Sequence, residues 1–346
     1  MPQDKKCPSC GGVMLFEPER NKLVCQYCGN MEDIPEINTD EVALEVDIST
    51  AKSTASHDWG ISTRIVHCSL CGAETVNDAL QMSGRCPFCG STTVTSIGED
   101  DDMIAPNAVI PFKITQGEVE QIFRKWISKR FFAPSGIKNG SKLNGFTGVY
   151  LPYWTFDADT VTDYSGRFGY DRMSGDKRYT DWKTRKGTIT KFLNDYPVFA
   201  SRRFLSNKYY KRIGNYNTDV AKKYTPVVLA GFLTERYSIG IEEAWTIAKQ
   251  RLITEFRREA KIRENADQIH NVDVSTTYSN IKFKYVLAPL WISSYSFKGR
   301  KYTIFINGQT GDISGTCPTS MAVAIFILIF VIGMFIMFIV GIILTL

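Results

Sequence analysis

The motif Cys7-Pro-Ser-Cys10-Gly11 recurs three times along the chain, as Cys25-Gln-Tyr-Cys28-Gly29, Cys68-Ser-Leu-Cys71-Gly72 and Cys86-Pro-Phe-Cys89-Gly90. The first two copies form one C-x2-C-x14-C-x2-C pattern, and the last two repeat it about 61 residues later. Two thiolates three positions apart in a tight turn can supply two of the four tetrahedral ligands of Zn²⁺. The glycine after each pair gives the turn its backbone freedom. The repeat therefore predicts two zinc ribbons, each a small β unit with one structural zinc ion.

The metal-ligating residues follow from this pattern. We expect one Zn²⁺ to be bound by Cys7, Cys10, Cys25 and Cys28, and a second by Cys68, Cys71, Cys86 and Cys89. Disulfides and redox Cys-x-x-Cys chemistry are the competing interpretations, and four glycine-followed pairs in two matching repeats favour metal. Four protein ligands leave no open position on the metal for catalysis. His67 adjoins Cys68 and is interpreted as a bystander.

Charge is divided unevenly along the chain. The 346 residues include 41 Lys and Arg and 36 Asp and Glu, which gives a net charge of +5. Residues 1–102 hold 7 basic and 17 acidic residues, whereas residues 103–346 hold 34 and 19. Because contacts to phosphate need clusters of Lys and Arg, we expect the acidic ribbons to bind a protein partner rather than a nucleic acid.

The pattern of apolar and polar residues after the ribbons, over residues 107–316, predicts one larger α+β domain with a mostly antiparallel sheet. Thr115-x-x-Glu118 is a capping-box pattern ahead of a helical apolar face that ends at Ile127. A second amphipathic helix is expected over residues 241–260. Aromatic and β-branched runs predict strands, among them 148–156 and 285–293, and each of these two has a Pro two positions before a Trp. This similarity suggests a pseudo-duplicated sheet.

The C-terminal residues 321–346 contain no charged side chain. As a helix they would span about 39 Å, which exceeds a hydrocarbon core of about 30 Å. Lys298, Arg300 and Lys301 precede this segment, so the positive-inside rule predicts a tail-anchored, single-pass protein of the cell membrane with residues 1–320 in the cytoplasm. The basic surface of the α+β domain then has three interpretations: a solvated face, attraction to the anionic inner leaflet, or nucleic-acid binding.

We divide the chain into six parts on these grounds. They are zinc ribbon 1 (1–30), an acidic linker (31–62), zinc ribbon 2 (63–98), a second acidic linker (99–106), a basic α+β domain (107–316) and a transmembrane helix (321–346). The expected fold class is α+β, with two small β zinc ribbons beside the larger domain.

Motifs that carry catalysis are missing from the sequence. It contains no GxxxxGK[ST], HExxH or GxSxG pattern, and its three histidines are scattered. The carboxylates of Asp157, Asp159 and Asp163 are interpreted as a solvated run. We therefore expect neither an enzyme nor a small-molecule substrate.

The order of several segments resembles a known family. His57-Asp-Trp-Gly60 lies between the CPxCG-like ribbons, and Val109–Phe112, Gly148–Trp154 and Ile306–Gly311 follow. With the apolar C-terminus, these segments are similar to the bacterial TFIIB-type zinc-ribbon membrane proteins, some of which are labelled primosomal or replication proteins. The resemblance implies metal ligation by the eight cysteines and recruitment of partners, in association with SPFH-domain proteins and a phage-shock-like stress system. The ATPase motif that a helicase label requires is missing here.

From these features we predict a non-enzymatic, membrane-anchored zinc-ribbon adaptor that recruits protein partners to the cytosolic face of the membrane. The cofactors expected are two structural Zn²⁺ ions. The alternative is a membrane-tethered nucleic-acid-binding protein with a role in replication.

Overall fold

The computed structural model describes residues 7–12, 14–17, 22–25, 27–33, 43, 45–51, 55–59, 63–78, 85–98, 103–130, 133–134, 137, 145–226, 232–297, 300–318, 332–334 and 336–337. Within these ranges the chain is mostly β, with fifteen strands and three α-helices among its elements. The predicted α+β class is therefore wrong. Three very long strands lie within residues 147–297, and the helices only cover the large sheet that these strands form.

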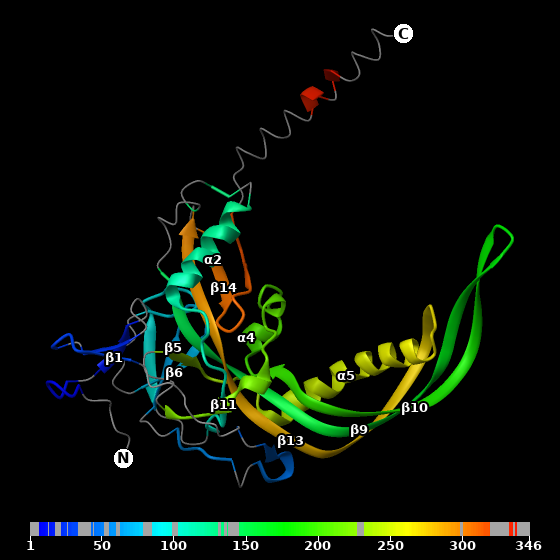
Figure 1. Cartoon of the computed structure of the whole chain (residues 1–346), viewed down its shortest axis with the longest axis horizontal. Coiled ribbons are helices and arrows are strands. Elements are labelled where there is room, and N and C mark those ends of the chain that lie inside the picture. The colour runs from blue at the N-terminus through cyan, green and yellow to red at the C-terminus, as the bar shows by residue number, and fades with distance from the viewer. Residues whose placement is uncertain are drawn as a thin grey trace.

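A three-stranded antiparallel arm dominates the architecture (Figure 1). It is formed by β9 (Thr147–Ser174), β10 (Lys177–Phe199) and β13 (Gln268–Phe297), with β9 in the middle. In the outer half of β9, buried and exposed side chains alternate from Ala158 to Phe168. This alternation is typical of an antiparallel sheet with one solvated face.

Helix α5 (Ile241–Arg263) packs along the arm and buries the other face of the sheet. Its buried side chains recur every three or four residues, as the sequence predicted: Ala244, Trp245, Ala248, Leu252, Phe256 and Ala260. The rings of Trp245 and Phe156 meet with their centroids 5.1 Å apart. The predicted amphipathic helix over 241–260 is thus confirmed.

The two segments with a Pro two positions before a Trp lie side by side at the base of the arm. In the ladder between β9 and β13, Trp154 pairs with Tyr285, and Tyr150 pairs with Pro289. Residues 148–158 of β9 are all buried, because here both faces of the sheet are covered. The Nε1–H of Trp154 donates a hydrogen bond to the carbonyl oxygen of Ile239 at 2.8 Å.

Shorter strands extend the sheet beyond β9. β12 (Leu233–Glu235) runs parallel to β9 and antiparallel to β6 (Glu74–Asp78). β6 pairs with β5 (Thr63–Cys68), which pairs with β7 (Val94–Gly98). The three strands of the second ribbon are therefore part of the main sheet.

Other short strands extend the sheet beyond β13. β8 (Ala108–Val109) lies between β13 and β11 (Lys222–Lys223), and β4 (Val46–Asp47) pairs with β13 further along. β14 (Arg300–Asn307) pairs with β13 and with β15 (Ile313–Gly315). The linker between the two ribbons thus contributes a strand to the base of the arm.

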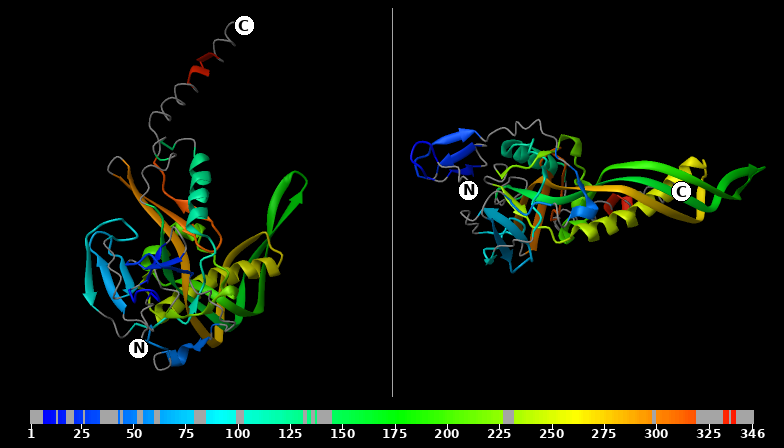
Figure 2. Two further views of the ribbon diagram at one scale, coloured as in Figure 1. Left: turned by 60° about the vertical axis from the view of Figure 1, so that its left-hand side comes forward. Right: turned by 90° about the horizontal axis from the view of Figure 1, so that it is seen from below.

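The first ribbon forms a sheet of its own. β1 (Met14–Glu17), β2 (Lys22–Cys25) and β3 (Met31–Asp33) pair only with one another among the described strands. This small sheet lies at the opposite end of the molecule from the tip of the arm (Figure 2). The two ribbons therefore differ in their attachment, although their cysteine spacing is the same.

Helix α2 (Gln116–Ser128) begins at the predicted capping box. The N–H of Thr115 donates to Glu118 Oε2 at 2.8 Å, and the N–H of Glu118 donates to Thr115 Oγ1 at 3.4 Å. The remaining short helices are α4 (Arg202–Leu205) and three 3₁₀ turns over Ile48–Thr50, Tyr210–Arg212 and Thr218–Val220.

The predicted transmembrane helix over residues 321–346 falls almost entirely outside the described residues. In the described ranges, no helix combines the length and the apolar character that crossing a bilayer requires. On this finding we correct the predicted location: a single-pass protein of the cell membrane with its N-terminal domains in the cytoplasm is not supported.

Candidate metal centres

Each cysteine pair lies in the same kind of backbone turn. In the first turn, the N–H of Gly11 donates to the carbonyl oxygen of Cys7 at 2.8 Å, and the N–H of Cys7 donates to that of Gly12 at 2.7 Å. The same two bonds recur in the other three turns. The glycine after each pair has a φ between +68 and +71°. Because an L side chain is strained in this conformation, the turn requires glycine at that position.

The first two turns bring four sulfur atoms together. The Sγ atoms of Cys7, Cys10, Cys25 and Cys28 all lie within 4.8 Å of one another. The sulfurs of Cys7 and Cys28 are 3.4 Å apart, as are those of Cys10 and Cys25. These separations exceed a disulfide bond of about 2.05 Å. They approach the edge of about 3.8 Å that follows for a sulfur tetrahedron with Zn–S bonds of about 2.3 Å.

Hydrogen bonds in the turns lower the pKa values of Cys7 and Cys25, whereas the pKa values of Cys10 and Cys28 are raised. Burial opposes ionisation of Cys7, but the N–H groups of Ser9 and Cys10 and the neighbouring thiols lower its pKa to about 6. A thiolate is the form of cysteine that ligates zinc. The four clustered sulfur atoms of the first ribbon therefore fit one zinc ion.

The second pair of turns forms an equivalent site inside the main sheet. The Sγ atoms of Cys68, Cys71, Cys86 and Cys89 lie within 4.8 Å of one another. The Cys68–Cys89 and Cys71–Cys86 sulfur separations are both 3.6 Å. Phe88, in the turn between Cys86 and Cys89, is buried and packs against Phe204 of α4 with 5.9 Å between ring centroids.

Arg203 of α4 contacts the second site directly. Its guanidinium donates to the carbonyl oxygen of Cys71 at 2.9 Å and to the Cys71 sulfur at 3.5 Å. It also lies 4.9 Å from the centre of the Phe88 ring. Burial raises the pKa of the Cys71 thiol, but the hydrogen bond and positive charge of Arg203 bring it down to about 7. Arg203 thus offsets negative charge that four thiolates and one zinc ion would leave in the sheet.

Two further contacts fix the second site in the sheet. Glu235 of β12 is 4% exposed, lies 3.6 Å from Arg203 Nε and accepts a hydrogen bond from Ser201 at 3.0 Å. Burial raises the pKa of Glu235 to about 8, against the lowering effects of Arg203 and Ser201. Lys301 of β14 donates to the carbonyl oxygen of Cys89 at 3.2 Å.

His67 lies outside the four-sulfur group of the second site. Its Nδ1 is 3.4 Å from the carboxylate of Glu74, on the neighbouring strand β6. All eight predicted ligands thus lie in two clusters of four, and the side chain of His67 contacts Glu74 instead.

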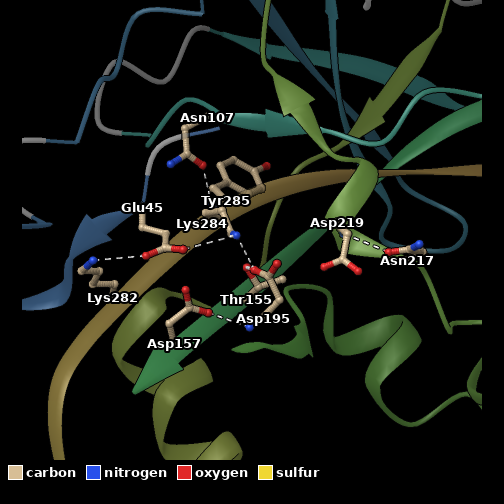
Figure 3. A network of polar contacts seen from close by, with 10 residues as sticks. All are labelled: Glu45, Asn107, Thr155, Asp157, Asp195, Asn217, Asp219, Lys282, Lys284 and Tyr285. Atoms are coloured by element: carbon tan, nitrogen blue, oxygen red, sulfur yellow. Dashed lines mark hydrogen bonds and ion pairs between the residues drawn. The ribbon is translucent and has the colours of Figure 1, made fainter. Parts of the chain in front are cut away.

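A network of charged side chains lies at the base of the arm (Figure 3). Lys284 Nζ of β13 is 2.6 Å from Asp195 Oδ1 and 3.8 Å from Glu45 Oε1. Thr155 donates to the same Asp195 oxygen at 2.9 Å. Lys282 Nζ lies 3.3 Å from the other oxygen of Glu45. The network therefore joins the linker between the ribbons to the arm.

Asp157 belongs to this network and is 3% exposed, so our interpretation of it as solvated is wrong. Its Oδ1 accepts a hydrogen bond from the N–H of Asp195 at 2.6 Å. Burial, followed by the nearby Glu45, raises the pKa of Asp157 to about 6. Asp159 and Asp163 are exposed as expected, where they accept hydrogen bonds from Asn280 and Thr188.

Many basic side chains of the larger region are paired with carboxylates. Arg202 lies 2.7 Å from Glu243, Lys191 lies 3.3 Å from Glu259, and Arg185 lies 3.8 Å from Glu264. These pairs involve only some of the basic residues, and the excess of 34 basic over 19 acidic residues in 103–346 remains.

Comparison with known proteins yields one relative. The chain is similar to YdjG of Bacillus subtilis. The two are 27% identical over 329 residues, which is 91% of this chain and 90% of the relative, whose name is Uncharacterized protein YdjG. No family model and no solved structure matches the chain. The resemblance therefore has support from a distant relative over most of the chain, whereas membership of the TFIIB-type family is not confirmed.

Sequence reasoning missed the residues that surround the second site and form the buried network. Arg203 follows Arg202 in a basic run and has no feature that separates it from a surface residue. Lys284 carries a detectable signal, since it is the last charge before a continuous apolar run and stands between Phe283 and Tyr285. A charge in that setting is usually paired when it is buried.

Proposed function

We propose that the protein is a non-enzymatic zinc-ribbon adaptor whose metal-bound turns present apolar side chains to a protein partner. The observation that carries this proposal is the exposure of two large side chains inside the cysteine turns. Tyr27, between Cys25 and Cys28, is 83% exposed, and Leu70, between Cys68 and Cys71, is 59% exposed. Exposed apolar groups on a rigid frame are typical of protein contact sites.

Zinc gives the turns the rigidity that such a contact needs. Metal ligands on both sides of Tyr27, Cys25 and Cys28, hold the turn that carries its ring. Tyrosine offers a large contact area and loses little side-chain entropy on binding. Met31 of β3 is 47% exposed on the same ribbon, and Ile97 of β7 is 55% exposed on the second. Each ribbon thus offers more than one apolar group.

Charge indicates the chemistry of the partner. The first 102 residues are strongly acidic, so we expect an apolar patch with a basic rim on the partner. The family resemblance makes SPFH-domain and phage-shock-like proteins the first partners to test. The proposal includes no catalysis, because the buried charged groups at the base of the arm bind one another.

Site-specific photo-crosslinking in cells tests the proposal. Benzoylphenylalanine placed at position 27 or 70 should give an adduct with the same partner, and Cys25→Ser should abolish the adduct formed from position 27. Position 192 is the matched control, since Phe192 is 58% exposed on the arm. The proposal fails if position 192 gives the same adduct, or if neither ribbon position gives one.

Nucleic-acid binding is the competing outcome. The full-length, zinc-loaded chain should show no more than weak, salt-sensitive binding to duplex or single-stranded DNA, because the ribbons are acidic and several basic residues of the arm and α4 are paired with carboxylates. Submicromolar binding at physiological salt would favour the nucleic-acid alternative over the adaptor.

A further inference from the structure

A polar cavity of about 570 Å³ lies between the end of helix α2, the 3₁₀ turn Tyr210–Arg212 and the hairpin of β14 and β15. These elements are distant in sequence, and α2 lies beside the hairpin (Figure 1). The charged residues that line the cavity are two arginines, Arg130 and Arg212, and one carboxylate, Asp312. A volume of this size is typical of small-molecule sites. The cavity is therefore large enough for a ligand, and its lining has a net positive charge.

The two arginines of the cavity are accessible and are not neutralised by a carboxylate. Both side chains are exposed. Within the described ranges, no Asp or Glu oxygen lies within 4.0 Å of the guanidinium of Arg130 or Arg212. Arg124 of the same helix differs, because it lies 3.9 Å from Glu120 one turn away. The cavity thus brings together two positive charges whose hydrogen-bond donors are available to a ligand.

The guanidinium of Arg130 is held against an aromatic ring at the cavity wall. Its Cζ lies 3.9 Å from the centre of the Trp126 ring, and Trp126 also lines the cavity. So short a distance is typical of a guanidinium stacked on an indole, a contact that uses the flat face of the group. The N–H groups at its edge remain free to donate to an acceptor in the cavity.

The turn that carries Arg212 is fixed to the hairpin. Asn307 Nδ2 donates to the carbonyl oxygen of Ile213 at 2.7 Å and to that of Asn215 at 3.2 Å. Asn307 and Tyr210 are both fully buried. The backbone on either side of Arg212 is thus anchored, and its position at the cavity does not depend on a ligand. Such a preformed site is usual for small-molecule pockets.

We propose that this cavity binds a phosphate group between the guanidinium groups of Arg130 and Arg212. Guanidinium is complementary to phosphate because two of its N–H groups can donate parallel hydrogen bonds to two oxygens of the anion. Three hydroxyl-bearing residues line the same cavity and can donate to the remaining oxygens: Tyr209, Tyr302 and Ser314. The inference goes beyond the adaptor proposal and does not depend on it, since no ribbon residue lines the cavity.

Asp312 opposes the binding of an anion in this cavity. Its Oδ2 accepts a hydrogen bond from Thr310 Oγ1 at 2.8 Å, and its side chain is exposed. Because like charges repel, this carboxylate lowers the affinity that the two arginines provide. Removal of its charge should therefore have the opposite effect to removal of either arginine, which gives the inference a test by gain of binding.

Calorimetry on the full-length, zinc-loaded chain tests the inference. The probe is glycerol 3-phosphate, and glycerol is the matched compound without the phosphate. We expect the wild type to bind the first and not the second. Arg130→Gln and Arg212→Gln should each weaken binding about tenfold or more, because each removes charge-assisted hydrogen bonds. Asp312→Asn should strengthen binding about threefold.

Arg124→Gln is the matched control for these variants. It removes one positive charge from the same helix, but away from the cavity lining, so its affinity should stay within about twofold of the wild type. Because all three arginines are exposed, the variants should unfold at the wild-type temperature without probe. The inference is overturned if the wild type does not bind glycerol 3-phosphate at millimolar concentration, if either cavity variant binds it unchanged, or if Arg124→Gln loses as much affinity.

A second probe distinguishes the source of the phosphate. Dioctanoyl phosphatidic acid presents the same group on a short-chain lipid. Binding that is more than about tenfold tighter than that of glycerol 3-phosphate would assign the site to a lipid headgroup, and similar affinities would assign it to a free phosphomonoester. Both results support the site only if Arg212→Gln weakens them, and lipid binding that is unchanged in Arg212→Gln would overturn the inference.

Discussion

Replacement of Arg203 by methionine tests the account of the second zinc site. The variant keeps most of the side-chain volume over Phe88 but loses both hydrogen bonds to Cys71 and the contact with Glu235. A hydrogen bond that involves a charged group contributes about 1.5–3 kcal/mol. The bond to the carbonyl and the longer, weaker one to the sulfur together predict a loss of about 3 kcal/mol in the free energy of unfolding. Because the thiolate also loses its nearest positive charge, zinc affinity at this site should fall about tenfold.

Arg202→Met is the matched control for this experiment. Arg202 precedes Arg203 on the same helix, but its ion pair with Glu243 is exposed, with side-chain exposures of 64% and 43%. Exposed pairs contribute about 0.5 kcal/mol, so this variant should be close to the wild type.

Urea unfolding of the zinc-loaded chain measures the stability, and transfer of zinc to a chromophoric chelator resolves the two metal ions. In Arg203→Met, one of two zinc equivalents should leave faster while the other leaves at the wild-type rate. The reasoning is refuted if the two arginine variants have equal stability, or if the release of both zinc ions is unchanged.

Three further predictions follow from burial and packing. The pKa of Glu235 is raised from 4.5 to about 8 by burial, so the folded carboxyl keeps a proton that the unfolded chain releases, and stability should fall as pH rises from 5 to 8. Glu235→Gln should flatten that slope in urea unfolding at pH 6, 7 and 8, and an unchanged slope would contradict the assignment. A Cβ on Gly166 would lie 2.6 Å from the Cα of Val272, so Gly166→Ala should lower the free energy of unfolding by about 2 kcal/mol in denaturant titrations. Cys86→Ser should lower the main thermal transition seen by circular dichroism, whereas Cys25→Ser should leave it unchanged, because only the second ribbon shares the main sheet. Equal effects of the two serine variants would argue against this difference.

Local patterns in the sequence predicted local structure well. The four cysteine turns need only a few consecutive residues, and the glycine that ends each turn marks the required positive φ. The capping box at Thr115 and the apolar face of α5 are likewise set by residues three or four positions apart. Elements of this kind can be predicted from the sequence because the contacts that stabilise them join residues close in sequence.

The long strands and the surroundings of the second site could not be predicted in this way. Trp154 pairs with Tyr285, and Arg203 contacts Cys71. The residues of each pair are more than 100 positions apart in the chain, and a local hydrophobic pattern carries no information about such contacts. The predicted α+β class failed because β9 continues through 28 residues. The sequence of its buried half is a run of mostly apolar residues, whereas polar and apolar residues alternate in its outer half. The two halves therefore do not resemble parts of one strand.

The order of strands in the arm has a consequence for synthesis of the chain. β9 and β10 are consecutive and can pair as soon as both have left the ribosome, but the second edge of β9 is completed by β13, which begins some 94 residues after β9 ends. At an elongation rate of about 5–20 residues per second, that edge waits roughly 5–20 s for its partner. Its base contains Trp154 and Phe156, both fully buried in the finished protein. The nascent chain thus exposes an apolar strand edge in this interval, when a holding chaperone would have most to protect.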